Sequence, residues 1–278
     1  MNISWKIKSH IFSLIEILGI DTVLYFIQKN ITRSSHLDIK KIDDNWLIHQ
    51  ENFSAFKPEI LLEFGAGKSL AQNIYFSKFI RKQFVVDITD MLDVNLFNQA
   101  VDQISKLDNI IKKDICLNNF DIEEKYRIKY VAPFNFGADS FEPNSVDCCV
   151  STNTLEHIPL NEINVIFKKL FSIVRNGGVI SMVIDYIDHY SYFDKSIHKF
   201  NFLKYSKSEF QQFNHRNHYQ NQLRHYDFIN IFKSLGYEIL ISEFEDICEI
   251  PKNVSEDFNV TEPSLGASKG IFLLKVIK

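Results

Sequence analysis

The chain contains few cysteines, and their spacing suits neither a metal site nor a disulfide framework. Only four of its 278 residues are cysteine: Cys116, Cys148, Cys149 and Cys248. No C-x-x-C pair occurs, and two of the four are adjacent within an apolar run, so the sequence predicts no structural zinc. Buried free thiols are typical of a reducing compartment, and we therefore expect a cytoplasmic protein.

The chain also lacks a strong excess of positive charge and a long apolar segment. Its formal net charge is −4, so we expect no nucleic acid among its partners. Residues 11–28 are apolar but interrupted by Glu16 and Asp21, so we expect no membrane span. Their apolar periodicity predicts an amphipathic helix that packs on the main domain, with membrane-surface association as the alternative. The periodic positions are Ile11, Ile15, Leu18, Val23 and Phe26.

From residue 58 onward, segments of strand and helix character alternate. Strands are predicted at residues 59–64, 83–88, 128–132, 146–151, 177–184, 237–246 and 270–277. Helices are predicted near 69–81, 94–106, 160–175 and 225–235. This alternation predicts an α/β fold with a Rossmann-like, seven-stranded, mostly parallel sheet and helices on both faces. The last two strands follow each other without a helix, so we expect an antiparallel C-terminal hairpin at one edge.

Two stretches lie outside this alternation. Residues 1–57 precede the first strand and are predicted to form an N-terminal helical extension, leaving 58–278 as the main domain. Residues 185–224 interrupt that domain after the fifth strand and carry many polar and aromatic groups. Insertions at the carboxyl ends of strands lie over the ligand crevice. We therefore expect residues 185–224 to be a substrate-binding lid.

Glycine is scarce, yet two of the nine glycines stand in the sequence I-L-L-E-F-G-A-G that begins at residue 60. The pattern predicts a strand that carries the acid Glu63 near its end, followed by a turn of Gly65, Ala66 and Gly67. A dinucleotide fingerprint needs a third glycine where this chain has Leu70. The acid would repel a pyrophosphate but would accept from a cation. S-adenosylmethionine, which carries an ammonium and a sulfonium group, fits these features.

Further polar residues follow the next two predicted strands. Asp87 ends the second strand, where a carboxylate can accept hydrogen bonds from both ribose hydroxyls of a bound nucleoside. Asn135 or Asp139, after the third strand, can hydrogen-bond the adenine amino group. Ordinary turn chemistry is an equally good explanation for these two residues. The sequence therefore predicts a nucleoside site at this edge of the sheet.

The clearest family resemblance begins at Ser145 with S-V-D-C-C-V-S-T-N-T-L-E-H-I-P and continues at Arg175 with R-N-G-G-V-I. These segments resemble class I S-adenosylmethionine-dependent methyltransferases, whose fourth strand reads roughly S-F-D-x-V-x-S-x-x-V-L-E-H-I. A later passage of that family reads R-x-L-K-P-G-G, and here Arg175 and Asn176 replace the usual Lys-Pro before the two glycines. The resemblance covers about residues 58–185 and implies S-adenosyl-L-methionine as the cofactor.

The resemblance also implies roles for the residues already singled out. The backbone at Gly65 and Gly67 would lie near the methionine portion of the cofactor, with Glu63 near its ammonium group. Asp87 would hold the ribose. Leu155, with neighbouring apolar groups, would line the adenine side.

A narrower resemblance extends into residues 185–224. The sequences D-Y-I-D-H-Y-S-Y-F-D from Asp185 and H-Y-Q-N-Q-L-R from His218 are similar to S-D-H-Y and N-R-L-R. Those motifs occur in methyltransferases found with bacterial surface-polysaccharide genes, although Gln222 stands where they usually have arginine. This similarity implies a small-molecule or glycan acceptor.

Two histidines are candidates for the base that removes a proton from an acceptor hydroxyl. His189 follows the fifth strand beside Asp188, and His157 follows the fourth strand. His157 has an alternative role, which is to cap or orient the helix that begins near Pro159. An anionic acceptor would need no base. The basic and aromatic residues 215–225 suit either a phosphorylated sugar or a solvated loop. No histidines show ligand spacing, so we expect no metal.

The leading hypothesis is an enzyme, a methyltransferase that uses S-adenosylmethionine to methylate an oxygen of a sugar or glycan precursor. The alternatives are a methyltransferase for another small acceptor, such as a quinone, lipid or peptide, and a non-catalytic S-adenosylmethionine-binding protein. A nicotinamide oxidoreductase is disfavoured by Leu70 and Glu63. The sequence does not indicate an oligomeric state.

Overall fold

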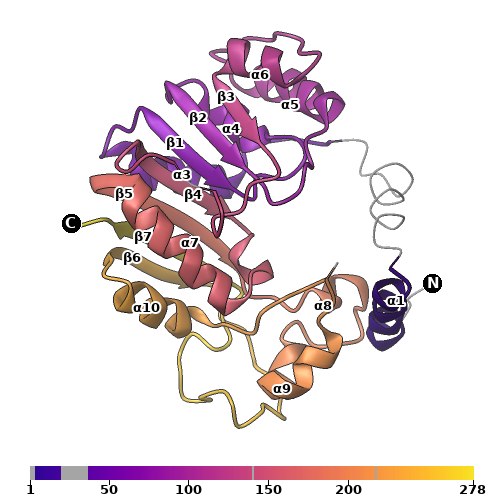
Figure 1. The fold of residues 1–278 in the computed structure, drawn as a ribbon. Coiled ribbons are helices and arrows are strands. Elements are labelled where there is room, and N and C mark those ends of the chain that lie inside the picture. The colour runs from indigo at the N-terminus through magenta and orange to yellow at the C-terminus, as the bar shows by residue number, and fades with distance from the viewer. Residues whose placement is uncertain (1–3, 20–36, 140, 217) are drawn as a thin grey trace.

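One seven-stranded sheet organises the molecule (Figure 1). A computed structural model describes residues 4–19, 37–139, 141–216 and 218–278. The sheet order is β3-β2-β1-β4-β5-β7-β6, with β1 to β5 parallel and β7 antiparallel to both β5 and β6. The predicted Rossmann-like sheet with an antiparallel C-terminal hairpin is confirmed. The strands are β1 (Ile60–Phe64), β2 (Lys82–Val86), β3 (Ile128–Val131), β4 (Val146–Thr152), β5 (Val174–Asp185), β6 (Glu238–Glu245) and β7 (Lys269–Lys275).

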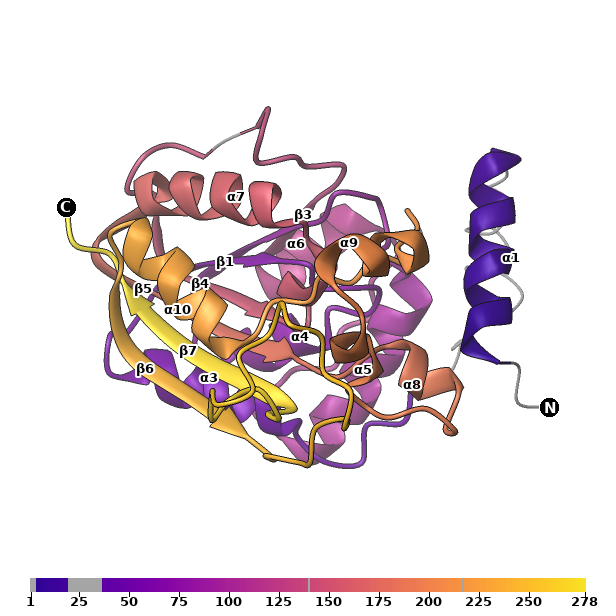
Figure 2. The ribbon, with the colours of Figure 1, turned by 90° about the horizontal axis from the view of Figure 1, so that it is seen from below.

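Helices cover both faces of this sheet (Figure 2). One face carries α7 (Leu160–Ile173) and α10 (His225–Ser234), whose apolar side chains join the larger core cluster. The other face carries a second apolar core. Its helices are α3 (Asp44–Ser54), α4 (Ala71–Phe76), α5 (Val94–Leu107) and α6 (Asn119–Tyr126). Placing apolar layers on both faces leaves the carboxyl ends of the parallel strands as the free edge where polar side chains gather.

The helix after β1 is shorter than the predicted 69–81. It begins at Ala71 because Leu70 adopts the left-handed conformation, with φ of +49°. It ends at Phe76, and the chain then turns through residues 77–81 to enter β2. The predicted length was therefore wrong, although the helix itself is present. No described helix combines the length and apolar character needed to cross a membrane.

An N-terminal helix, α1 (Trp5–Ile17), confirms part of the helical prediction for residues 11–28. Positions 23 and 26 of the predicted apolar stripe lie outside the described residues. Ile11 and Leu18 are exposed, and Ile15 is half-buried. The prediction that these positions form the packing face was wrong. The buried positions, Trp5, Ser9 and Phe12, lie on another side of the helix.

The α1 helix packs on the insertion rather than on the sheet. The Trp5 ring lies 5.2 Å from the Tyr190 ring and 4.6 Å from the Phe213 ring, measured between centroids. The backbone N–H of Trp5 donates to the carboxylate of Asp194 at 2.9 Å. Tyr190 is the first residue of α8 (Tyr190–Phe193), and Asp194 follows this helix directly. Figures 1 and 2 both show α1 beside α8. The α1 helix and the insertion therefore form one packed unit.

The insertion shares a small apolar core with the chain between β6 and β7, and a buried arginine fastens it to the sheet domain. Its further short helices are η2 (Asn201–Lys204), α9 (Lys207–Phe210) and η3 (Gln211–Phe213). Arg224 is 1% exposed, and its guanidinium donates to the backbone carbonyls of Tyr186, Leu265 and Ala267 at 2.7–2.8 Å. His225 is buried against the Phe272 ring. Arg224 and His225 thus neither face solvent nor offer their groups to a phosphate.

Candidate functional site

The turn after β1 brings bare backbone to the carboxyl edge of the sheet. Gly65 has φ of +78°, and a Cβ there would collide with the side chain of Thr154, so only glycine fits. Gly67 has φ of +73° and open space where a Cβ would stand. Ala66 between them is half-buried. A ligand can therefore approach the backbone closely at Gly67.

Glu63 lies at the end of β1 and is 2% exposed. Its two carboxylate oxygens accept from Nε2 of Gln72 at 2.9 Å and from Nδ2 of Asn73 at 2.7 Å. Burial raises the pKa of Glu63 to about 8, although the two amides oppose the shift. The sequence analysis missed these amides, whose only signal is that polar residues occupy the buried side of α4. They fix a carboxylate that a nearby ammonium group would hold ionised.

This buried acid makes the stability of the ligand-free protein depend on pH. Because the folded pKa of about 8 exceeds the ordinary value of 4.5, folded Glu63 keeps its proton where the unfolded chain has lost it. Its stabilising contribution is full below the unfolded pKa and declines until pH passes about 8. We expect Glu63→Gln to gain stability over the natural protein progressively between about pH 5 and pH 8. Urea unfolding at several pH values, with the exposed Glu162→Gln as the control, measures this; parallel pH curves for all three proteins would contradict it.

Asp87 follows β2 directly, beside the glycine turn. It is 8% exposed, and its Oδ2 atom is buried without a hydrogen-bond partner among the described residues. The Tyr130 hydroxyl interacts with this carboxylate, and burial raises the pKa of Asp87 to about 6. A buried acceptor without a donor needs a partner to offset its desolvation. The free oxygen can accept a ligand hydroxyl.

The loop after β3 contains both residues predicted for adenine. Asn135 Oδ1 accepts from the backbone N–H of Gly137 at 2.8 Å, and Asp139 Oδ2 accepts from the backbone N–H of Asn135 at 2.8 Å. These bonds are the turn chemistry that the sequence analysis left open. Phe134 donates from its backbone N–H to the carbonyl of Asp87 at 2.9 Å, which holds the loop beside the second strand. Leu155 is buried in the larger core.

His157 and His189 come from separate strand ends and meet. Their ring centroids lie 4.6 Å apart. Nδ1 of His157 donates to the carbonyl of Tyr219 at 2.9 Å, and desolvation lowers the pKa of His157. This ring does not cap α7, whose N-cap residue Pro159 receives no side-chain cap. His157 instead ties the loop after β4 to the insertion.

Asp185, rather than Asp188, lies against the candidate base. Nε2 of His189 is 3.4 Å from Oδ2 of Asp185, which also accepts from the Tyr192 hydroxyl. Asp188 is fully buried, accepts from the backbone N–H of Tyr190 at 2.9 Å, and has its pKa raised to about 6 by burial. The sequence analysis missed Asp185 as a partner; its signal is the four-residue spacing from His189 in the chain.

Glu156 is another group that the sequence analysis missed. It is 2% exposed, and neither carboxylate oxygen has a hydrogen-bond partner among the described residues. Burial raises the pKa of Glu156 well above its ordinary value. One ligand atom each from Glu156, His157 and His189 lies within 4.8 Å of the others. Glu156 and His157 are adjacent in the chain, but His189 is far from them in sequence, and this hid the set from the sequence analysis.

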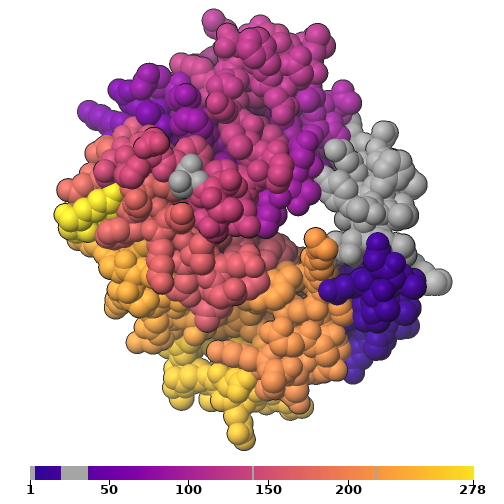
Figure 3. Space-filling view, in the orientation of Figure 1, coloured from indigo at the N-terminus to yellow at the C-terminus, as the bar shows by residue number. Residues whose placement is uncertain are grey.

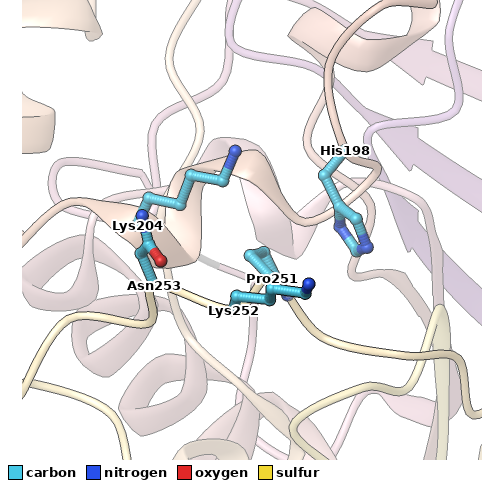
Figure 4. A pocket seen from close by; sticks show the side chains of 5 residues that line it. All are labelled: His198, Lys204, Pro251, Lys252 and Asn253. Carbon is cyan, nitrogen blue, oxygen red and sulfur yellow. The ribbon is translucent and has the colours of Figure 1, made fainter.

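A pocket lies apart from these groups, between the insertion and the chain that joins β6 to β7. Figure 3 shows an opening between the orange insertion and the purple-to-magenta part of the molecule. The pocket has a volume of about 310 Å³, and none of its lining residues belongs to the site described above. Figure 4 shows it between η2 and the chain that joins β6 to β7, with lining residues His198, Lys204, Pro251, Lys252 and Asn253.

Solved structures of methyltransferases are similar to this chain. The sequence matches no family model and no curated protein. Burkholderia thailandensis 1,6-didemethyltoxoflavin-N1-methyltransferase, solved with 1,6-didemethyltoxoflavin and S-adenosylhomocysteine, is similar over 95% of this chain and 90% of that chain, with 10% identity and a TM-score of 0.54. The N-methyltransferase NodS from Bradyrhizobium japonicum WM9 is similar over 84% and 94%, with 9% identity and a TM-score of 0.46. Human N-acetylserotonin methyltransferase, solved with SAM, is similar over 84% and 52%, with 12% identity and a TM-score of 0.47. The chain thus has the Rossmann-like fold found in methyltransferases.

Proposed function

We propose that the protein is a cytoplasmic S-adenosylmethionine-dependent methyltransferase that methylates an oxygen of a sugar or glycan precursor in polysaccharide biosynthesis. One observation carries the proposal. The open glycine turn and the unpartnered Asp87 oxygen lie at the same sheet edge as the His157–His189 pair. That edge is where open α/β sheets bind ligands, and it offers groups for a cofactor beside groups for a proton.

The cofactor groups suit a cationic nucleoside. The free oxygen of Asp87 would accept the ribose hydroxyls, and Gly65, Ala66 and Gly67 would bring backbone to the methionine portion. Glu63 would lie near the ammonium group, whose charge favours the ionised carboxylate. The loop of residues 135–139 and the segment at residue 155 would flank adenine, with Asn135 or Asp139 at its amino group.

Methyl transfer is an in-line displacement at the methyl carbon. Bound S-adenosylmethionine would supply the methyl group: the acceptor oxygen would bond to the methyl carbon as the carbon–sulfur bond breaks, with the sulfur leaving as a neutral thioether. The acceptor's proton passes to His189, which Asp185 orients from 3.4 Å away. Asp188 would act indirectly, because its carboxylate fixes the backbone that carries His189. Alignment and exclusion of water can supply about 7–11 kcal/mol of the barrier reduction.

The insertion supports a role as the acceptor lid of the domain at 58–278. The segment at residues 218–220 reaches the candidate site, since the carbonyl of Tyr219 accepts from His157 and the Gln220 side chain accepts from the backbone N–H of His189. In the N-terminal extension, residues 1–57, Trp5 packs against the insertion at Tyr190 and donates from its backbone N–H to Asp194. Aromatic rings and amides of this kind suit the faces and hydroxyls of a sugar.

Transfer of label from methyl-labelled S-adenosylmethionine tests the proposal. We expect label in a sugar or nucleotide-sugar acceptor, as an ether that survives mild base, whereas a methyl ester would be released. Asp87→Ala serves as the control in which cofactor binding is weakened, and we expect it to transfer less label at the same cofactor concentration. Label in a quinone, lipid or peptide, and not in sugars, would move the acceptor to that class. Cofactor binding without transfer to any acceptor would favour a non-catalytic binding protein.

A further inference from the structure

Glu156, His157 and His189 form a group with the composition of a metal site. Their ligand atoms all lie within 4.8 Å of one another. Glu156 contributes a carboxylate that is 2% exposed and has no hydrogen-bond partner among the described residues. A buried, ionised carboxylate without a partner is unfavourable, and a cation is one way to compensate it. Two neighbouring histidines alone would not indicate a metal site; the buried acid beside them does.

The surroundings of the two histidines match those of metal ligands. A metal-bound imidazole commonly donates its other ring N–H to a backbone carbonyl or a carboxylate. Nδ1 of His157 donates to the carbonyl of Tyr219 at 2.9 Å, which leaves Nε2 free for an ion. His189 has the carboxylate of Asp185 at 3.4 Å from its Nε2 atom. The His157 ring thus has an outer acceptor of the expected kind, and the Asp185 carboxylate lies beside the buried Nε2 atom of His189, which makes no hydrogen bond among the described residues.

The distances require a small closure around an ion. Metal–ligand bonds of about 2.1 Å in a tetrahedral site place donor atoms about 3.4 Å apart. Atoms that lie within 4.8 Å of one another must therefore approach by up to about 1.4 Å. His157 is exposed, so its ring can supply part of this movement by rotation.

We propose that Glu156, His157 and His189 bind one divalent transition-metal ion. Two imidazole nitrogens and one carboxylate favour ions such as Zn²⁺, Mn²⁺ or Fe²⁺ over Mg²⁺, which prefers oxygen ligands. Three protein ligands leave a coordination position open for an oxygen atom of the acceptor. The cofactor turn is adjacent, because the Thr154 hydroxyl donates to the carbonyl of Gly65 at 3.3 Å.

The use of this ion in methyl transfer rests on the proposed function. An acceptor hydroxyl bound to the ion would lose its proton more readily, to a water molecule, before its oxygen attacks the methyl carbon. His189 would then be a ligand and not a free base. If His189 is a metal ligand, a chelator should abolish turnover. If it is a free base, a chelator should leave turnover unchanged, so metal dependence decides between the two roles.

Titration of chelator-treated protein with Co²⁺, followed by its visible absorption, tests the site without any methyl transfer. We expect saturable binding of one Co²⁺ per chain, with affinity reduced at least about tenfold in Glu156→Gln and in His157→Asn. Glu162→Gln and His198→Asn are the matched controls outside the group, and we expect them to bind as the natural protein does.

Stability and cofactor binding, measured on the same samples, separate the possible failures. Glu156→Gln removes a buried acid without a partner, so we expect it to unfold in chelator at a temperature no lower than the natural protein. Absence of one-to-one Co²⁺ binding, or equal affinity in the two ligand variants, would overturn the metal site. If S-adenosylhomocysteine still bound in that case, the proposed function would stand and only the metal site would fall.

Discussion

Replacing Asp87 by alanine is expected to weaken the binding of S-adenosylhomocysteine about 100-fold. The reason is the buried Oδ2 atom, which has no donor among the described residues and would accept a ribose hydroxyl. A hydrogen bond to a charged group contributes about 1.5–3 kcal/mol, and the carboxylate can accept from two hydroxyls. Isothermal calorimetry measures the change. Because burial raises the pKa of Asp87 to about 6, we also expect affinity in the natural protein to fall as pH decreases through that value.

A ligand analogue makes this test specific. The 2′-deoxy form of S-adenosylhomocysteine should bind the natural protein more weakly than the parent compound. Asp87→Ala should discriminate little between the two, because the acceptor for that hydroxyl is gone. Unchanged affinity of Asp87→Ala for the parent compound, in a variant that unfolds cooperatively in urea, would show that Asp87 does not hold the ribose.

His189→Ala is expected to lower kcat by about 10²–10⁴, with S-adenosylhomocysteine affinity changed less than about twofold. The ring lies at the carboxyl end of β5 beside His157 and Asp185, where an acceptor hydroxyl would lose its proton. Steady-state kinetics together with calorimetry separates the two effects. His10→Ala, in the N-terminal helix, is the control for a histidine outside the site.

The companion variant Asp185→Asn tests whether this carboxylate orients the histidine. It should lower kcat less than His189→Ala does and should shift the pH profile of kcat. Full turnover in His189→Ala would remove the residue from the reaction. It would also leave an anionic acceptor, which needs no base, as the alternative.

All seven strands were predictable within about three residues because their signals are local. Apolar runs bounded by turn residues marked them, and the fifth strand begins earlier than predicted, at Val174, because that residue still pairs with Val146. The α6 helix was missed since its sequence, N-F-D-I-E-E-K-Y, buries only Ile122 and Tyr126 and lacks a clear apolar stripe. The predicted face of α1 was wrong because its partner is the insertion, which sequence periodicity cannot reveal.

The candidate site was likewise predictable only where its residues are close together in the sequence. Glu63, Gly65 and Gly67 are contiguous in the chain, so their common role was predictable from one short motif. The amides that hold Glu63 and the Asp185 carboxylate beside His189 required the packed structure. Those partners are set by which strand ends lie side by side, and neighbouring residues in the sequence carry little information about that.

Calorimetry with S-adenosylhomocysteine and with NAD, in parallel, tests the cofactor assignment most directly. Two features favour a cationic nucleoside over a pyrophosphate. The acid Glu63 lies beside the turn, and Leu70 stands where a dinucleotide motif has its third glycine. We predict one-to-one binding of S-adenosylhomocysteine and no heat of binding with NAD. Binding of NAD without binding of S-adenosylhomocysteine would contradict the methyltransferase assignment.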